Sequence, residues 1–384
     1  MAARGRGDVG GVPFGSGGVV MRVALVHDWL TGMRGGEGVL AEIASFFPGA
    51  PIYTLFHRDG AVTGEVASHP IHTSGLQRLS LGGRVYRPLL PWMPQAVAAF
   101  QLGGYDLIVS SSHCVAKGVI PPPGAVHVCY CHTPMRYLWD QSDDYVRRFA
   151  APLRPLLRRE LEHLRTWDVV SAARVDHFVA NSRLVARRIE RYWRRDAEVI
   201  PPPVDVDFFT PGGEHGPHLL MVAALVPYKR VEVGIAVAKQ LGMPLHIIGE
   251  GPMRRSLAWQ ATGSVRFLGR VTRERLRDEY RSAALLLVPN VEDFGMVTVE
   301  ALACGTPVVG LEGSGTADVV VSGEHGALAG DGSVGALAAA CREVLARRFD
   351  DRGLHARAES FSRQRFRRRF AYLLERVLPA RQEP

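Results

Sequence analysis

The sequence predicts an α/β protein of two domains, each built on a parallel sheet covered by helices. Short apolar runs of strand length alternate with segments of helical periodicity along the chain, which is the pattern of such sheets. The chain has 384 residues, enough for two domains with separate cores. Three consecutive prolines at 201–203 form a stiff connector near the middle, and we place the domain boundary there.

The composition excludes several classes of protein. The formal net charge of +8 fits nucleic acid, anionic membranes or phosphorylated substrates, but no nucleic-acid recognition motif accompanies it. The five cysteines are odd in number and lack zinc-like spacing, which indicates reduced thiols. No apolar run reaches the length of a membrane span, and residues 1–20 lack the apolar core of a signal peptide. We expect a cytoplasmic protein with no nucleic-acid partner, either soluble or peripheral on the inner face of the cytoplasmic membrane.

Residues 21–200 are expected to form the first domain. The glycine-rich segment 1–20 has no periodicity, so we expect it to be disordered, or to result from a start site assigned upstream of Met21. The apolar run 22–28 predicts the first strand. Later strands of this domain are expected at 52–56, 106–110, 126–131 and 177–180.

A glycine-bearing loop at 32–38 follows the first strand and precedes an amphipathic helix. Glycines allow the backbone to approach a phosphate closely, and the start of a helix offers free N–H groups to an anion. Gly35 and Gly36 are therefore candidate phosphate-binding residues. By itself the pattern is equally typical of a simple turn.

The strand at 126–131 leads directly into His132. A single histidine at a strand end is more often structural than catalytic. The carboxyl end of a parallel strand, however, faces the crevice in which open α/β sheets hold their ligands. His132 is therefore kept as a catalytic candidate.

Residues 201–360 are expected to form the second domain. Its strands are expected at 218–225, 245–248, 265–268 and 284–289. Lys229 and Arg230 lie between the first strand and the first helix of this half. A lysine at a helix start is disfavoured by the helix dipole unless an anion is bound there. The final segment, 361–384, carries apolar residues at helical spacing.

The segment 290–309 is the most informative stretch of the chain. A loop leads into a short helix that is expected to begin near Met296 and to end at Gly305. Glu292 lies on the loop and Glu300 one turn into the helix, so both carboxylates can reach one hydroxyl-rich ligand. A bare pair of glutamates at this spacing is more often a solvated loop acid and an ordinary helix acid.

This stretch resembles the signature of the retaining glycosyltransferases of family 4. These proteins have the GT-B architecture, in which two Rossmann-like domains face each other across a cleft. Their signature places two glutamates, with seven residues between them, in the phrase E-x-F-G-x-x-x-x-E-A-x-A-x-G-x-P-V. The matching residues here are Glu292, Phe294, Gly295, Glu300, Ala301, Ala303, Gly305, Pro307 and Val308. The resemblance extends from about Met21 to the final helix.

The resemblance implies roles for residues in both halves. Glu300 would bind the nucleotide ribose, Glu292 would hold sugar hydroxyls, and Lys229 would neutralise the leaving diphosphate. His132 would contact the transferred sugar, and the final helix, 361–384, would cross back to the first domain. Further donor contacts are implied at Gly35, Gly36, Gly249, Arg270, Val271, Phe294, Gly295, Met296 and Val297.

One position departs from the family pattern. The family places an arginine and a lysine after the first strand of the second domain, where they grip the donor diphosphate. Lys229 is present here, but Ala224 stands at the arginine position. Either Arg34 or Arg230 supplies the second positive charge, or donor binding is weak, or activity has been lost. A nucleotide-sugar-binding protein without turnover is therefore the alternative to an enzyme.

The resemblance also implies the substrates: a hexose moves from a nucleotide diphosphate sugar to a glycan or polyprenyl-linked acceptor. The phrase at 130–137 resembles the branch that acts in O-antigen and exopolysaccharide mannosylation, which favours GDP-mannose as the donor. UDP- and ADP-sugars remain open. The donor phosphate itself is expected to take the acceptor proton. No Asp-x-Asp motif follows a strand, so we expect neither an essential metal nor a cofactor.

A basic segment at 152–167 is a candidate contact for an anionic membrane surface. It carries five leucines at helical spacing beside four arginines. A core-packed helix with a solvated basic face explains the same pattern.

Overall fold

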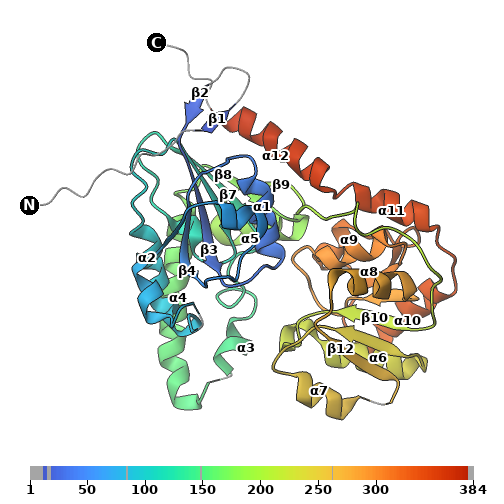
Figure 1. Ribbon diagram of the computed structural model, residues 1–384. Coiled ribbons are helices and arrows are strands. Elements are labelled where there is room, and N and C mark those ends of the chain that lie inside the picture. The colour runs from blue at the N-terminus through green and yellow to red at the C-terminus, as the bar shows by residue number, and fades with distance from the viewer. Residues whose placement is uncertain (1–11, 15–18, 84, 148, 262, 379–384) are drawn as a thin grey trace, which may run out of the picture. The chain divides into compact units, whose positions relative to one another are not determined.

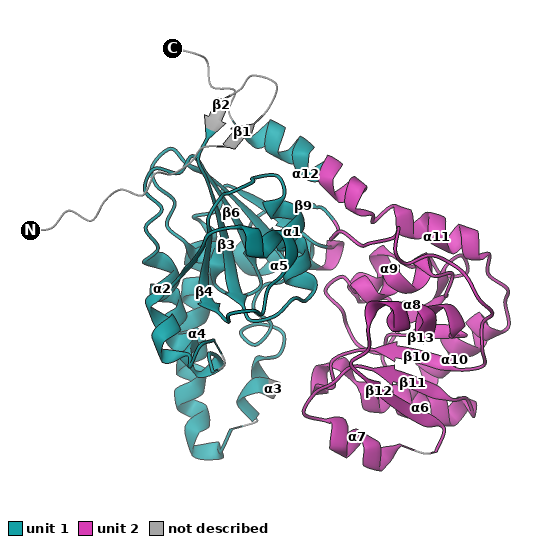
Figure 2. Cartoon of the chain, in the orientation of Figure 1, with its two compact units in different colours: residues 1–181, 185–200, 369–384 teal, residues 182–184, 201–368 magenta. Residues whose placement is uncertain are grey.

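The computed structural model describes residues 12–14, 19–83, 85–147, 149–261 and 263–378 (Figure 1). The chain divides into two compact units (Figure 2). Unit 1 comprises residues 1–181, 185–200 and 369–384, and unit 2 comprises residues 182–184 and 201–368. The main division lies between Ile200 and Pro201, at the start of the proline run.

Unit 1 contains a seven-stranded parallel sheet in the order β5-β4-β3-β6-β7-β8-β9. Its strands are β3 (Val23–Leu30), β4 (Ile52–His57), β5 (Ile71–Thr73), β6 (Leu107–Ser112), β7 (Val126–Cys131), β8 (His177–Ala180) and β9 (Ala197–Val199). Strands β3, β6 and β7 are buried almost throughout, as expected for strands covered on both faces. Because β3 pairs with both β4 and β6, the strand order reverses beside it. Ligands bind such sheets at the carboxyl ends of the strands near this reversal.

The helices of unit 1 connect these strands. They are α1 (Gly35–Ala44), α2 (Met93–Ala98), α3 (Ser142–Arg147), α4 (Arg154–Ala172) and α5 (Arg183–Trp193). Short 3-10 helices lie at Gly64–Ser68, Gly75–Leu79, Arg87–Trp92, Ala116–Gly118 and Ala151–Leu153. The final helix, α12 (Arg363–Val377), belongs to unit 1 from Arg369 onward. There Phe370 is fully buried, and its ring centroid lies 5.5 Å from that of Phe46.

Unit 2 contains a six-stranded parallel sheet in the order β12-β11-β10-β13-β14-β15. Its strands are β10 (Leu219–Val222), β11 (Leu245–Ile248), β12 (Val265–Gly269), β13 (Leu285–Leu287), β14 (Val308–Leu311) and β15 (Gly326–Ala329). Its helices are α6 (Val231–Leu241), α7 (Arg254–Gln260), α8 (Arg273–Ser282), α9 (Met296–Ala303), α10 (Val334–Leu345) and α11 (Asp351–Glu359), with 3-10 turns at Pro227–Lys229 and Gly315–Asp318. Residues that alternate along the strands belong to two separate apolar clusters. One contains α8, α9 and α11 residues and the other contains α6 and α10 residues, so helices cover both faces of the sheet.

The two parallel sheets confirm the predicted fold class. The expected strand at 218–225 is shorter than predicted, because residues 223–225 belong to the loop that follows Val222. The glycine-rich segment 1–20 lies mostly outside the described residues. Within it and at its boundary, β1 (Val12–Phe14) and β2 (Val19–Met21) form a short antiparallel pair that the glycine content did not predict.

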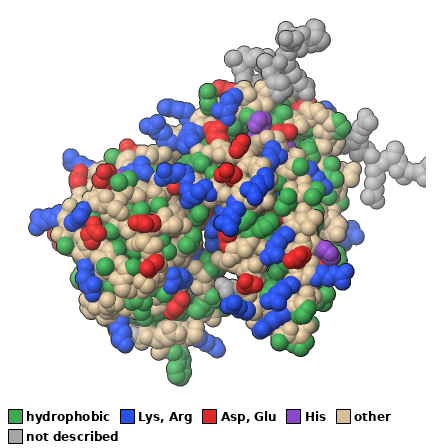
Figure 3. Space-filling model, turned by 180° about the vertical axis from the view of Figure 1, so that it is seen from behind, with side chains coloured by type: hydrophobic (Ala, Val, Ile, Leu, Met, Phe, Trp, Pro, Cys, Tyr) green, Lys and Arg blue, Asp and Glu red, His purple; other side chains and the backbone are tan. Residues whose placement is uncertain are grey.

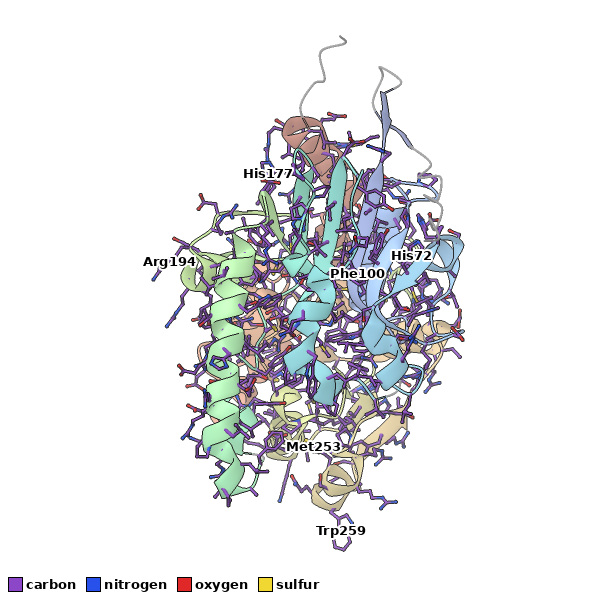
Figure 4. All side chains as sticks on the ribbon, turned by 90° about the vertical axis from the view of Figure 1, so that its left-hand side faces the viewer. His72, Phe100, His177, Arg194, Met253 and Trp259 are labelled. Carbon is purple, nitrogen blue, oxygen red and sulfur yellow. The ribbon has the colours of Figure 1, made fainter. Side chains whose placement is uncertain are left out.

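The surface carries charges of both signs. On the face shown in Figure 3, Lys and Arg side chains are interspersed with Asp, Glu and apolar ones. Among the described helices, none is both long enough and apolar enough to cross a membrane. Figure 4 shows α4 as the long green helix, with side chains projecting along its full length.

Candidate active site

In unit 2 the predicted signature begins in the loop between β13 and α9 and continues through α9 to the start of β14. Helix α9 begins at Met296, as predicted, and Gly295 precedes it with φ +88°. A side chain is disfavoured at that φ, and a Cβ there would lie 3.1 Å from the Thr298 hydroxyl. The glycine therefore allows the chain to turn sharply out of the sheet and into the helix. In the first helical turn the Thr298 N–H donates to the Gly295 carbonyl, at 2.9 Å. Helix geometry leaves the N–H groups of Met296 and Val297 without intrahelical acceptors, which suits an anion.

Lys229 and Glu292, which are far apart in sequence, meet in this region. The Lys229 Nζ atom lies 2.5 Å from Glu292 Oε1, and both side chains are largely buried. Asn290 Nδ2 donates a hydrogen bond of 3.0 Å to the same oxygen. One oxygen of the buried carboxylate is therefore compensated by two donors. A buried, paired cation of this kind can also hold a diphosphate, which would compete with Glu292 for it.

A second loop holds Glu292 in place through its backbone. Ser314 Oγ accepts a hydrogen bond of 2.9 Å from the Glu292 N–H, and the Gly315 N–H donates one of 2.8 Å to the Glu292 carbonyl. Sequence reasoning missed Asn290, Ser314 and Gly315. The signal that could have found them is the Gly313-Ser314-Gly315 turn directly after a buried strand.

Glu300 lies on α9, where its Oε2 accepts a hydrogen bond of 2.8 Å from the Tyr280 hydroxyl. Burial raises the pKa of the Glu300 carboxyl, and the Tyr280 hydrogen bond offsets only part of this effect. Burial also raises the pKa of Tyr280, so its hydroxyl remains a donor. One carboxyl oxygen of Glu300 is thus held by α8, and the other is available to a ligand hydroxyl. Tyr280 was not among the predicted site residues.

The backbones of the loops after β10 and β11 are in direct contact. Gly249 has φ +135°, and a Cβ there would lie 2.0 Å from the Ala223 carbonyl oxygen, so only glycine fits. Ala224 itself is exposed on the first of these loops, and Arg270 is exposed after β12 with half-buried Val271 beside it. The predicted donor-binding residues of this half therefore all follow carboxyl ends of strands.

Arg230 does not share the partners of Lys229. It has left-handed backbone angles, φ +51° and ψ +39°, at the residue preceding α6. Its guanidinium lies against Gly332, where a Cβ would be 2.0 Å from Nη1. Hydrogen bonds from Ser333 lower the pKa of the neighbouring Asp331, and the charge of Arg230 adds to this effect. Arg230 therefore points toward the loop after β15, whereas Lys229 points toward Glu292.

In unit 1, His132 follows β7 and its ring packs among other histidines. Its Nε2 lies 2.8 Å from Ser111 Oγ, and its ring centroid is 6.5 Å from His27 and 6.2 Å from His113. Burial lowers the pKa of His132 well below its ordinary value, and the two neighbouring histidines lower it further. His132 is therefore a neutral imidazole at neutral pH, able to exchange hydrogen bonds with a hydroxyl.

The glycine-bearing loop of unit 1 lies beside His132. A Cβ on Gly36 would lie 3.8 Å from both His132 Nε2 and His27 Cε1. Helix α1 begins at Gly35, and the Arg34 N–H donates a hydrogen bond of 3.1 Å to Glu37 Oε2 at the helix start. Arg34 also lines a pocket of about 430 Å³ within this unit. The predicted loop and the predicted histidine thus share one region of unit 1.

The neighbours of His132 are anchored by a buried carboxylate that the prediction missed. Asp28, at 0% exposure, accepts hydrogen bonds of 2.6 to 2.9 Å from four successive backbone N–H groups. Its Oδ2 also lies 3.1 Å from His113 Nδ1. His27 and Asp28 lie in the second half of β3, Ser111 lies near the end of β6, and His113 directly follows β6. The sequence feature that could have indicated this arrangement is the polar pair His27-Asp28 inside the first apolar run.

Two family models match separate stretches of the chain. Residues 44–208 match the family model described as Glycosyltransferase Family 4, and residues 216–347 match the one described as Glycosyl transferases group 1. The two parallel-sheet units have the fold class of GT-B glycosyltransferases, and both matching models describe glycosyltransferase domains. Two separate stretches of the chain are thus each similar to a glycosyltransferase domain family.

Relatives and solved structures of this class are also similar to the chain. D-inositol 3-phosphate glycosyltransferase of Geodermatophilus obscurus is 34% identical over 212 residues, which cover 46% of this chain and 47% of that protein. The enzyme of the same name from Mycolicibacterium smegmatis is 31% identical over 198 residues, covering 45% and 46%. The chain thus spans about half the length of these relatives.

Two solved structures share the fold over nearly the whole chain. The structure of Anabaena HepE in complex with UDP has a TM-score of 0.65 at 17% identity, covering 92% of this chain and 100% of that one. Sucrose-phosphate synthase from Thermosynechococcus elongatus has a TM-score of 0.68 at 17% identity, covering 92% and 99%. At this identity the likeness concerns the fold alone.

Proposed function

We propose that the protein is a hexosyltransferase that uses a nucleotide diphosphate sugar. The observation that carries this proposal is the convergence of Lys229, Glu292 and Asn290 beside the N-terminus of α9. A lysine and free helix N–H groups suit a diphosphate, and carboxylates accept hydrogen bonds from ribose and sugar hydroxyls. Both matching domain families are glycosyltransferase families, which supports the same conclusion.

In the proposed reaction Lys229 neutralises the diphosphate as it leaves the sugar. Once the diphosphate has replaced Glu292 as the partner of Lys229, Glu292 holds sugar hydroxyls. Glu300 binds the ribose. Stabilising the developing charge is normally the largest contribution to such a transfer. Neutral His132 contacts the transferred sugar, and a donor phosphate oxygen takes the acceptor proton on the same face. This course retains the anomeric configuration.

For the substrates we propose GDP-mannose as donor and a glycan or polyprenyl-linked acceptor in cell-surface polysaccharide synthesis. The support is the phrase at 130–137, which contains His132. UDP-sugars are the competing donors, because HepE is described in complex with UDP and UDP-glucose. An inositol phosphate is the competing acceptor, since that is the acceptor in the names of the relatives.

A thermal-shift screen of nucleoside diphosphates tests the donor. A ligand at 100 times its dissociation constant stabilises the folded state by about 2.7 kcal/mol. We expect GDP to raise the melting temperature more than UDP or ADP at equal concentration. A larger shift with UDP would overturn the GDP-mannose assignment and leave the transferase intact. No shift with any nucleotide would contradict the transferase itself.

A nucleotide-sugar-binding protein without turnover is the second candidate, because Ala224 removes one expected cation. Both candidates predict nucleotide binding, so binding does not separate them. Donor hydrolysis without acceptor, followed as released nucleoside diphosphate, does separate them. Binding with neither hydrolysis nor transfer would favour the second candidate.

Arg34→Ala is expected to lower turnover ten-fold or more, equivalent to about 1.4 kcal/mol, and Arg230→Ala to lower it less. Arg230 is engaged by the loop at Gly332, whereas Arg34 lines a pocket beside the glycine-bearing helix start. Ala224→Arg should be tolerated and should partly rescue Arg34→Ala. Steady-state kinetics on the single variants and the double variant measure this. Normal turnover in Arg34→Ala with a severe loss in Arg230→Ala would reverse the assignment.

The first turns of α4 are proposed to contact an anionic membrane surface. Leu161 and Leu164, in the middle of the helix, are buried, whereas Leu153 and Leu156 at its start are 51% and 60% exposed. Arg158 and Arg159 are exposed beside them. Binding to liposomes should require anionic lipid and weaken with salt. The variant Leu153→Ser/Leu156→Ser should bind at least ten-fold more weakly, because each buried leucine contributes about 1.5–3 kcal/mol.

The control for this experiment is Val170→Ser, which changes a residue of α4 with 58% exposure near its other end. This variant should bind liposomes as the parent does. Equal binding to neutral and anionic liposomes, or none to either, would contradict the membrane contact.

A further inference from the structure

Unit 2 contains a cluster of three potential metal ligands on the side of its sheet opposite to the candidate active site. His218 lies directly before β10, His246 is the second residue of β11, and Glu279 lies in the last turn of α8. The three side chains each offer one ligand atom, and these atoms lie within 4.8 Å of one another. The cluster is at the amino ends of the strands, whereas the proposed donor residues follow the carboxyl ends.

The distances between these atoms are close to those of a metal site. Glu279 Oε2 lies 2.8 Å from His246 Nδ1 and 3.8 Å from His218 Nε2. Ligands at about 2.0–2.2 Å around a tetrahedral zinc ion lie roughly 3.3–3.6 Å apart. Small shifts would bring Glu279 Oε2 to this spacing from each histidine, and the three ligand atoms all lie within 4.8 Å of one another.

His218 Nε2 is the second observation that points to a ligand. The residue is 8% exposed, and Nε2 is buried without a hydrogen-bond partner among the residues that the structure describes. The 3.8 Å to Glu279 is too long for a hydrogen bond. Leaving a buried polar atom unsatisfied costs about 1–3 kcal/mol, so a buried nitrogen of this kind normally has a partner. A metal ion placed between the three residues would supply one.

The charges around the cluster are mixed. Arg275 forms an ion pair with Glu279 Oε1, which orients the carboxylate and leaves Oε2 directed at the histidines. Burial lowers the pKa of His218, and His246 and Arg266 lower it further, while the charge of Glu279 acts in the opposite direction. A neutral His218 has a lone pair to offer. The two arginines oppose a cation, so affinity must come from coordination rather than from net charge.

We propose that His218, His246 and Glu279 form a binding site for a borderline divalent metal ion such as Zn²⁺. Two imidazoles and one carboxylate suit Zn²⁺, Co²⁺ or Ni²⁺, and they do not suit Mg²⁺ or Ca²⁺, which require mainly oxygen ligands. Water would fill the fourth position. The ion would join β10, β11 and α8, and it would do so whether or not the protein transfers a sugar.

The ion would also steady a residue of the candidate active site. Tyr280, the neighbour of Glu279 on α8, donates the hydrogen bond that holds Glu300. Both residues lie in the last turn of a single short helix. Fixing that turn at the metal would therefore limit the movement of the Tyr280 hydroxyl.

Metal titration of the tag-free protein, first stripped with EDTA, tests the site. Co²⁺ should bind with one equivalent and give the visible absorption of a low-symmetry site, and Zn²⁺ should displace it and raise the melting temperature. Mg²⁺ should do neither. Binding should weaken as pH falls, because protons compete for the two imidazoles. Failure of Co²⁺ and Zn²⁺ to bind the folded protein would overturn the proposal.

Variants separate this site from surface histidines. His218→Ala and Glu279→Gln should each weaken Co²⁺ binding about 100-fold or more, whereas His163→Ala, which removes an exposed histidine of α4, should leave it unchanged. His218→Gln and circular dichroism serve as checks on folding. Binding that persists unchanged in folded His218→Gln would overturn the assignment. Because nucleotide is absent from these measurements, their failure leaves the proposed transferase untouched.

Discussion

Lys229→Ala is expected to lower the rate of sugar transfer about 100-fold or more, equivalent to about 2.7 kcal/mol or above. Lys229 forms an ion pair with Glu292 beside the start of α9. A leaving diphosphate develops about two negative charges, and Ala224 contributes nothing to neutralise them. The loss should appear mainly in kcat, because this charge is greatest in the transition state. Steady-state kinetics with the preferred donor measure it.

Removing Lys229 also leaves the Glu292 carboxylate buried with fewer partners, so a loss of folding must be distinguished from a loss of chemistry. Lys229→Ala/Glu292→Gln removes that carboxylate charge as well and should be as inactive as the single variant while regaining its stability. Lys239→Ala serves as the matched control, because Lys239 is an exposed residue of α6. A folded Lys229→Ala variant with turnover within two-fold of the parent would refute the assignment.

Lys117→Met is expected to reduce the free energy of unfolding by about 3–5 kcal/mol. Lys117 and Asp168 are both 0% exposed, with Lys117 Nζ at 3.1 Å from Asp168 Oδ1. Asp168 Oδ2 also accepts hydrogen bonds from the indoles of Trp139 and Trp193. The substitution keeps most of the volume and leaves the Asp168 charge buried without its cation. Urea unfolding followed by tryptophan fluorescence reports on it.

A double variant distinguishes the unpaired charge from a packing defect. In Lys117→Met/Asp168→Asn the amide oxygen still accepts from the indoles, and no charge is left buried. Most of the lost stability should return. If the double variant is as unstable as Lys117→Met, or if Lys117→Met costs under 1 kcal/mol, the buried pair does not have this role.

Lys117 also bears on the candidate active site of unit 1. It follows directly on residues 113–116, whose backbone N–H groups hold Asp28. His113, the first of these residues, lies beside the His132 ring. Loss of the ion pair is therefore expected to loosen the loop that packs against His132.

Several features followed from the sequence alone. The alternation of apolar strands with periodic helices predicted both parallel sheets, because such strands are buried on both faces and read as continuous apolar runs. The start of α9 near Met296 was predicted correctly, since Gly295 is a residue that readily adopts the left-handed turn found there. These features depend on residues close together in the chain. Local backbone preference and burial pattern are sufficient to predict them.

Other features were decided only by the tertiary structure. Three contacts join residues that are distant in the sequence: Lys229 with Glu292, Tyr280 with Glu300, and Asp28 with the loop at 113–116. Tyr280 meets Glu300 because α8 and α9 pack in the same apolar cluster. Lys229 meets Glu292, and Asp28 meets its loop, because the carboxyl ends of neighbouring parallel strands lie at one edge of a sheet, and strand order is set by packing rather than by chain order. The same reason explains His218, His246 and Glu279, which gather at the opposite edge of the unit 2 sheet. The sequence by itself thus determined which chemical groups are available, and the packing of each sheet decided which of them meet.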